Sequence, residues 1–187
     1  YYNERGQDWY IDLALIDSGD QTDLVYDFCY LHFPLTVPVK GSSTPIPARY
    51  RQSTIQKEDS AARGLNLIIC DGSYYKNMIY AKINATDGSF QVFDGVDREY
   101  CDQVTSEHKV FERKNGVESW VWRKKTSDAQ NHYLDCEVYA ACAADLMGAF
   151  ALLEEPMEQP EAEPVSNQTE EDDDSWETDD DWGGDWI

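Results

Sequence analysis

The stretch Leu65-Asn66-Leu67-Ile68-Ile69-Cys70-Asp71-Gly72-Ser73 runs from an apolar segment directly into a turn and a helix-capping residue. A short, continuous apolar run is typical of a buried strand, and Asp-Gly is a frequent turn pair. Ser73 is a favourable N-cap for a helix that we expect to extend to about residue 83. The stretch therefore predicts a strand, a turn and a helix in succession, the repeating unit of a mixed α/β domain.

The same alternation continues towards the N-terminus. Residues 9–17 predict a buried strand that ends in Asp17-Ser18-Gly19. Residues 22–31 have the apolar spacing of a helix, and Asp20 or Thr22 could cap it. Residues 36–39 predict a short strand that Pro38 would confine to an edge or break.

Beyond these elements, residues 41–60 are polar and are expected to form a loop. Towards the C-terminus, Asn115-Gly116 is a strong signal for a hairpin turn. The remaining expected elements are a strand at 90–93, a short helix at 97–105, hairpin strands at 109–113 and 118–123, and an Ala-rich helix at 131–148.

The end of the chain differs sharply in composition from the rest. Residues 151–187 contain 15 acidic residues and no Lys or Arg, whereas residues 1–150 contain 22 acidic and 15 basic residues. Such a segment, interrupted by prolines and poor in aliphatic residues, cannot recover its ordering entropy by burial. We therefore expect a folded domain at residues 1–150 and a disordered acidic tail at residues 151–187.

Several classes of protein are excluded. The chain has no apolar run of about 18 residues, so no membrane span is expected. Its five cysteines show no CxxC spacing, which argues against a disulfide framework or a zinc site and favours a reducing cytosol. The first residue is Tyr rather than Met, so we expect a fragment of a longer polypeptide.

Three aspartates are candidates for a metal site. Asp17 and Asp71 follow predicted core strands, and Asp135 lies in the first turn of the last predicted helix. A carboxylate at such a position is costly unless it is solvated, paired or bound to a metal. If the three converge, they form a hard oxygen site for Mg²⁺ or Mn²⁺, and two such ions can hydrolyse a phosphodiester. The alternative is that they serve as turn and helix-terminus residues.

Two further side chains are candidates for the same site. His132 precedes Asp135 by three residues, so both can lie on one helix face, where His132 could ligate a metal or act as a base. Lys76 could contact a phosphate as a point charge. The alternatives are a capping or surface histidine and a solvated lysine.

The predicted hairpin is the one clearly basic stretch. A two-stranded ribbon fits a nucleic-acid groove, and its cations can neutralise phosphates. Alternatively, it is a solvated hairpin whose Trp120 and Trp122 pack on one face. The candidate DNA-binding residues are Lys109, Arg113, Lys114, Arg123, Lys124 and Lys125.

Two stretches resemble a known family. Residues 131–147, NHYLDCEVYAACAADLM, resemble the last helix of the nuclease domain in large terminase subunits of tailed bacteriophages, in the lambda-like DNA-packaging branch. Residues 14–29, ALIDSGDQTDLVYDFC, resemble the first motif of that domain, and the GSS of residues 41–43 matches as well. The resemblance covers roughly residues 9–148.

This resemblance implies a ribonuclease H-like fold and a metal-dependent endonuclease that cuts concatemeric viral DNA in the host cytoplasm. Asp17 and Asp135 match the motif aspartates, Asp71 matches less closely, and Lys76 stands where the family usually has a lysine. The chain departs from the family at Gln130, where an arginine is common, and at His132, where some members have glutamate.

The resemblance also implies partners. It implies an upstream ATPase domain that is absent here, double-stranded DNA as substrate, the portal or prohead as a docking partner, and the small terminase subunit as a further candidate partner. Trp176, Trp182 and Trp186 are candidate anchors of the tail on the portal; the tail could instead inhibit the nuclease or only solubilise it. The competing functions are a non-catalytic docking module of the packaging motor and a nuclease of the junction-resolvase type.

Overall fold

A computed structural model describes residues 6, 8, 10–42, 44, 46–114 and 116–151. The predicted acidic tail lies outside the described residues except for Ala151, and so do Trp176, Trp182 and Trp186. The description below concerns the part of the chain that precedes the tail.

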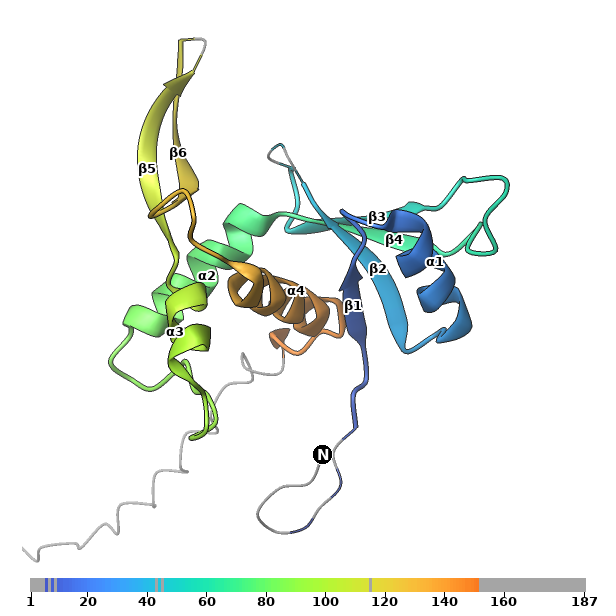
Figure 1. Cartoon of the computed structure of the whole chain (residues 1–187), viewed down its shortest axis with the longest axis horizontal. Coiled ribbons are helices and arrows are strands. Elements are labelled where there is room, and N and C mark those ends of the chain that lie inside the picture. The colour runs from blue at the N-terminus through green and yellow to red at the C-terminus, as the bar shows by residue number, and fades with distance from the viewer. Residues whose placement is uncertain are drawn as a thin grey trace, which may run out of the picture. The chain divides into compact units, whose positions relative to one another are not determined.

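A four-stranded sheet forms one side of the fold, with the strands in the order β1-β2-β4-β3 (Figure 1). The pairs β1–β2 and β2–β4 are parallel, whereas β3 is antiparallel to β4. A separate two-stranded antiparallel ribbon follows later in the chain. The sheet strands are β1 (Ala14–Asp17), β2 (Thr36–Gly41), β3 (Tyr50–Thr54) and β4 (Asn66–Cys70), and the ribbon strands are β5 (Glu107–Lys114) and β6 (Val117–Lys124).

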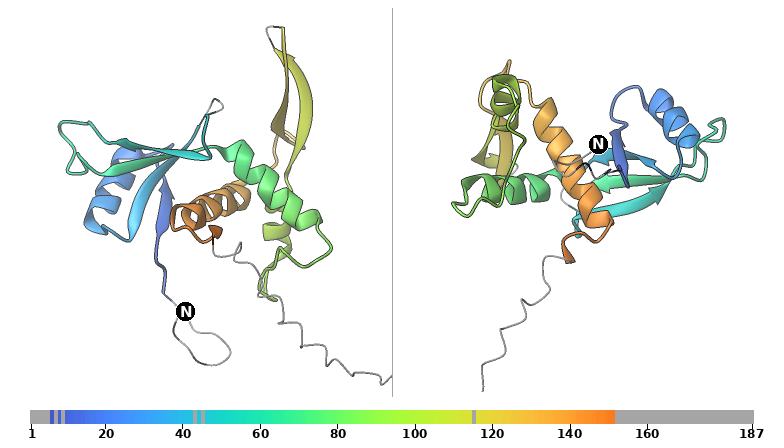
Figure 2. Two further views of the ribbon diagram at one scale, coloured as in Figure 1. Left: turned by 180° about the vertical axis from the view of Figure 1, so that it is seen from behind. Right: turned by 90° about the horizontal axis from the view of Figure 1, so that it is seen from below.

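Within the described part of the chain, four helices accompany these strands: α1 (Thr22–Leu31), α2 (Gly72–Asn84), α3 (Arg98–Val104) and α4 (His132–Leu146). Helix α4 packs against α2, α3 and β1, and Figure 2 shows it between the sheet and α2. The predicted mixed α/β class is therefore confirmed. None of the described helices is both long and apolar enough to cross a bilayer.

The main core joins the sheet to the two longer helices. Val39 and Ile68, on neighbouring strands, belong to one buried apolar cluster with Tyr75 and Ile79 of α2 and Val138 of α4. Burial of these side chains removes apolar surface from water, the main favourable term in folding. The cluster fixes α2 and α4 relative to the sheet, and with them the polar side chains described below.

The prediction that Pro38 marks an edge or broken strand is wrong, because β2 lies between β1 and β4. The Val39 carbonyl accepts a hydrogen bond from the Ser18 N–H on the β1 side (2.8 Å). The backbone N–H and C=O groups of successive residues point to opposite sides of a strand, so the backbone nitrogen of Pro38 points towards β4. Pairing with β4 begins only at Val39, opposite Ile68, so the missing N–H of Pro38 falls before the first paired position.

Two other strand predictions are wrong. The expected loop at 41–60 contains β3, whose polar sequence Tyr50–Thr54 gives no strand signal and which is held by its pairing with β4. The expected strand at 90–93 is irregular, and Phe93 is 72% exposed. Within the described residues that segment pairs with no other strand, so its alternating sequence pattern is not accompanied by strand hydrogen bonding.

The helix predictions are confirmed with changes at their ends. Helix α2 is capped by Asp71 rather than Ser73, because the Asp71 carboxylate accepts the Tyr74 N–H at 3.2 Å. The N-cap of α1 is Gln21, in a left-handed conformation, and the Thr22 hydroxyl donates to the Ser18 carbonyl at 2.8 Å. The first strand is shorter than expected and begins at Ala14.

Replacing Leu134 by alanine tests whether burial of α4 stabilises the fold. Leu134 is fully buried, so Leu134→Ala should lower the free energy of unfolding by about 2–5 kcal/mol in a urea titration. Leu24→Ala makes the same chemical change on a helix where the side chain is 64% exposed, and should cost less than about 1 kcal/mol. Equal losses at the two sites would contradict this placement of α4.

Candidate functional site

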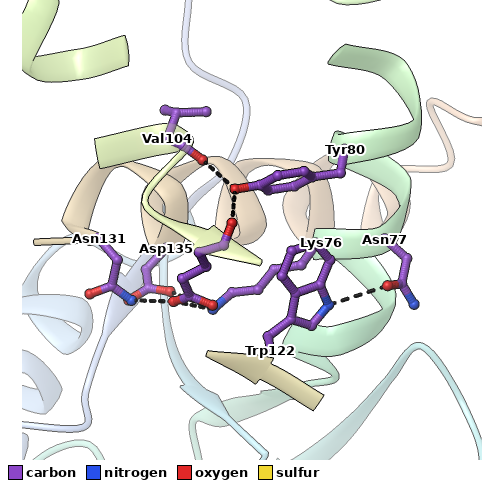
Figure 3. A network of polar contacts seen from close by, with 8 residues as sticks. Lys76, Asn77, Tyr80, Val104, Trp122, Asn131 and Asp135 are labelled. Carbon is purple, nitrogen blue, oxygen red and sulfur yellow. Dashed lines mark hydrogen bonds and ion pairs between the residues drawn. The ribbon is translucent and has the colours of Figure 1, made fainter. Parts of the chain in front are cut away.

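A buried carboxylate lies where β5, α2 and α4 meet. Glu107, the first residue of β5, is 4% exposed. The Lys76 ammonium nitrogen of α2 lies 2.9 Å and 2.8 Å from its two carboxylate oxygens. The side-chain amide of Asn131, directly before α4, donates to Glu107 Oε1 at 2.7 Å (Figure 3). The cost of burying this charge is therefore offset by an ion pair and a further hydrogen bond.

Asp135 extends this cluster by one turn of α4. The Asn131 amide also donates to Asp135 Oδ2 at 3.1 Å, and the Lys76 ammonium lies 3.5 Å from Asp135 Oδ1. Partial burial raises the pKa of Asp135, and the charges of Glu107 and Asp17 raise it further, while Lys76 acts in the opposite direction. We call Lys76, Glu107, Asn131 and Asp135 the carboxylate cluster; its carboxylates are held close together by one ammonium and one amide.

Asp135 borders a pocket on each side of α4. One pocket, of about 520 Å³, opens between α2, the base of the ribbon and α4. Its polar lining includes Ser42, Ser73, Lys76, Glu107, Arg123, Lys124 and Asp135. The other, of about 590 Å³, lies between β1 and α4 and is lined in part by Asp17, His132, Asp135, Cys136 and Tyr139. Asp135 is therefore the link between the predicted site residues Asp17 and His132 and the carboxylate cluster.

Two of the three predicted aspartates come together and the third does not join them. Asp17 is exposed and accepts the Gly19 N–H at 2.9 Å. Its charge adds to the effect of burial in raising the pKa of Asp135, and burial followed by nearby acidic charges, Asp17 among them, raises the pKa of Cys136. Asp71 lines neither pocket and uses its carboxylate as the cap of α2.

The described residues contain no group of three or more His, Cys, Asp or Glu side chains arranged to hold a metal ion. The close pair is Glu107 and Asp135, and the Lys76 ammonium lies near both. The two carboxylates therefore already have a positive charge beside them in the structure. In donor chemistry the cluster fits a hard divalent ion, which also prefers carboxylate oxygens.

Glu107 and Asn131 were missed by sequence reasoning. In sequence, a glutamate at the start of a charged strand resembles Glu112 and Glu118 of the same ribbon, which lie nearer the surface and pair with arginines. Nothing in its spacing separates it from them, because its burial comes from α2 and α4. Asn131 was recognised only as the start of a helix.

The base of the ribbon is fixed to α2 by aromatic residues as well as by the ion pair. The Tyr80 hydroxyl lies within hydrogen-bond distance of the Val104 and Glu107 carbonyls (3.2 Å and 2.8 Å), and the Trp122 indole N–H donates to the Asn77 side-chain oxygen at 3.2 Å (Figure 3). The rings of Tyr80 and Trp122 are 4.6 Å apart. The ribbon therefore leaves the helices from a rigid base beside Glu107.

The six predicted DNA-binding residues differ in their surroundings. Arg123 makes a bidentate pair with Glu112, 2.7 Å at both nitrogens, and Arg113 lies 3.8 Å from Glu118. The Lys109 ammonium is 5.9 Å from the Trp122 ring. Lys124 and Arg123 line the pocket beside Glu107, Lys125 lines a separate pocket against α3, and Lys114 is exposed near the ribbon tip.

Comparison with known families matches residues 1–153 to the family described as the terminase large subunit gpA, endonuclease domain. No curated protein and no solved structure matches the chain significantly. The match confirms the resemblance of residues 9–148, includes every member of the carboxylate cluster, and ends before most of the acidic segment.

The raised pKa of Asp135 predicts a gain in stability on neutralisation. A group with a raised pKa in the folded state favours unfolding above that pKa, and the penalty disappears as the pH falls below its ordinary value. Asp135→Asn should therefore increase the free energy of unfolding at pH 7, and the gain should shrink towards pH 4. Urea titrations at several pH values measure this.

Asp87→Asn is the control, because the pKa of Asp87 is shifted in the opposite direction to that of Asp135. The Ser89 N–H donates to the Asp87 carboxylate at 2.9 Å and lowers the pKa of Asp87, so its neutralisation should not stabilise the protein at pH 7. If Asp135→Asn instead destabilises the protein across the whole range, the Asp135 charge is a net stabilising part of the cluster.

Proposed function

The chain belongs to the family of terminase large subunit gpA endonuclease domains, and from this membership we propose that it cleaves concatemeric viral DNA during genome packaging. The observation that carries the proposal is the carboxylate cluster, which places the buried Glu107 and the partly buried Asp135 in a pocket at the base of a basic ribbon. Phosphodiester cleavage needs charge stabilisation at the phosphate and an activated water. The cluster supplies acidic groups for cation binding, and the ribbon supplies cations for the DNA backbone.

We propose that Glu107, Asp135 and Asp17 hold Mg²⁺ or Mn²⁺, with two ions as the full complement. Carboxylate oxygens suit these ions, and the Lys76 ammonium already lies near two of the three carboxylates, those of Glu107 and Asp135. When bound, such ions activate water and stabilise the leaving oxygen. Asp71 was predicted as a third ligand from the sequence, and its place in the site stays a prediction.

Residues of the chain itself would supply the remaining charge, proton transfer and phosphate binding. Lys76, once released from Glu107, offers a positive charge to the phosphate. His132 lines a pocket with Asp17 and Asp135, where its imidazole would act as a base or a metal ligand. Lys124 and Arg123 line the neighbouring pocket and would bind the phosphates that flank the scissile bond.

The wider assignments belong to the same proposal. A mixed sheet with acidic residues at the ends of its parallel strands is compatible with a ribonuclease H-like arrangement. We propose action in the host cytoplasm, an ATPase domain in the same polypeptide, the small terminase subunit as a further partner, and docking to the portal through the acidic tail. That tail would repel DNA phosphates, which favours a protein partner for Trp176, Trp182 and Trp186.

A non-catalytic docking module of the packaging motor is the second candidate function. One observation favours it: the described residues include no ready-made group of three metal ligands. A docking module would bind its partner without cutting DNA at any metal concentration, so a cleavage assay separates the two functions. A junction-resolvase type of nuclease would instead prefer branched DNA over plasmid.

Cleavage of supercoiled plasmid with Mn²⁺, with and without EDTA, tests the proposal. Glu107→Gln, Asp135→Asn and Asp17→Asn should each reduce nicking by on the order of 100-fold or more, because each removes a charge needed at the site. Urea titration shows whether each variant still folds.

Asp97→Asn is the matched control: it alters a helix-cap aspartate, which accepts the Tyr100 N–H at 2.8 Å and is not in either pocket. It should leave nicking unchanged. Asp71→Asn decides whether the third predicted aspartate takes part. Full activity in folded Glu107→Gln would remove Glu107 from the site, and no nicking by the wild type would support the docking module.

The role of Lys76 as a stand-in cation can be tested by metal binding alone. Lys76→Met removes the ammonium from Glu107 and Asp135, so Mn²⁺ should bind severalfold more tightly in calorimetric titrations, while nicking falls. Lys82→Met makes the same change in the last turn of α2 and should alter neither quantity. Unchanged or weaker Mn²⁺ binding in Lys76→Met would show that the metal does not use this position.

A further inference from the structure

The outer part of the β5–β6 ribbon carries an exposed aromatic pair. Phe111 and Trp120 are cross-strand partners, with ring centroids 5.3 Å apart, and they are 55% and 63% exposed. Cross-strand partners lie on the same face of a ribbon. Two large rings therefore stand in solvent on one face, beyond the base that α2 holds.

The two tryptophans of β6, Trp120 and Trp122, differ in their packing. Trp122, two residues further along β6, is packed on Tyr80 and donates to Asn77. Alternation along the strand puts Trp120 on the same face as Trp122. The two tryptophans share one face, as the alternative of a solvated hairpin expected, but Trp122 packs on Tyr80 of α2 whereas Trp120 packs on Phe111 of the ribbon. Packing thus explains Trp122 and leaves the exposure of Phe111 and Trp120 unexplained.

The charges around the aromatic pair indicate what it contacts. Residues 107–125 hold six Lys or Arg and three Glu, in a chain whose formal net charge is −22. One of the three glutamates, Glu107, is buried against Lys76. Lys109 and Arg113 flank Phe111 at positions two residues away on the same strand. The side chain of Arg113 is 71% exposed and lies 3.8 Å from that of Glu118, its cross-strand partner. An aromatic pair flanked by cations complements nucleic acid, which offers flat bases next to phosphates.

We propose that the Phe111–Trp120 face stacks on unpaired bases of DNA, so that the domain prefers a substrate with a single-stranded segment beside the site of cutting. Bases within a duplex are already stacked on one another and expose only their edges, which offer no face on which an aromatic ring can stack. Unpaired bases expose their faces, and stacking on aromatic rings is strong and independent of sequence. This inference rests on DNA being the substrate, as proposed above, but concerns binding rather than cutting.

Binding to fluorescently labelled DNA in EDTA tests the inference without cleavage. The full chain is titrated against a single strand, the matching duplex, and the same duplex with a short single-stranded flap. Trp120→Leu and Phe111→Leu should each weaken binding to the single strand and the flap about tenfold, because each removes a ring on which a base would stack. Binding to the plain duplex should change less than twofold. Trp120→Phe, which keeps a ring, should retain most of the affinity.

Val117→Ala is the matched control, because Val117 is an exposed apolar residue (67%) that lies opposite Lys114, on the other face of the ribbon. It should bind all three DNAs like the wild type. Equal losses on duplex and single strand would show that the aromatic pair contacts duplex DNA, and unchanged binding in Trp120→Leu would show that the pair serves a partner other than DNA. Either result overturns the inference. If the wild-type protein binds the single strand but does not cut plasmid, the proposed nuclease function is contradicted and the inference about base stacking stands.

Discussion

The contact between Lys76 and Glu107 is the interaction on which the rest of the site depends. It joins the middle of α2 to the first residue of β5, and the Asn131 amide ties the same carboxylate to the start of α4. The side chains of Lys76 and Glu107 are only 14% and 5% exposed, so the loss of either partner would leave a charge that water cannot fully solvate. A pair of this kind is costly to keep and adds little net stability compared with well-packed apolar residues. Its presence is better explained by a need for charge at this point than by a need for stability.

The ribbon has two regions with different environments: a base beside the Lys76–Glu107 contact, and an outer part. The base is held by the contacts of Trp122, on β6, with Tyr80 and Asn77 of α2, and by the contacts of Glu107. Further along, the strands pair only with each other, and the Phe111–Trp120 pair is exposed. A rigid base keeps the pocket residues Arg123 and Lys124 in place, while the outer part is free to meet a ligand. The same two strands can therefore contribute to both the chemistry and the choice of substrate.

The sequence predicted those features that are decided locally. The short helix at 97–105, the hairpin of β5 and β6 and the Ala-rich α4 depend on short-range patterns, and they are present. Features decided by distant partners were missed. Strand β3 exists because β4 pairs with it, Pro38 is tolerated because pairing with β4 starts one residue later, and Glu107 is buried by two helices far away in the chain. For the site, the pattern of strand-end and helix-start carboxylates led to Asp17 and Asp135, which share a pocket; it also led to Asp71, which caps α2.

We propose that Glu107 and Asp135 form a cation site that Lys76 occupies in the absence of metal. The most direct measurement is the anomalous scattering of Mn²⁺ in crystals of the protein soaked with the ion. We expect a peak within coordination distance of the Glu107 and Asp135 carboxylates, together with displacement of the Lys76 ammonium from Glu107. A peak elsewhere, or an intact Lys76–Glu107 pair at saturating Mn²⁺, would contradict it.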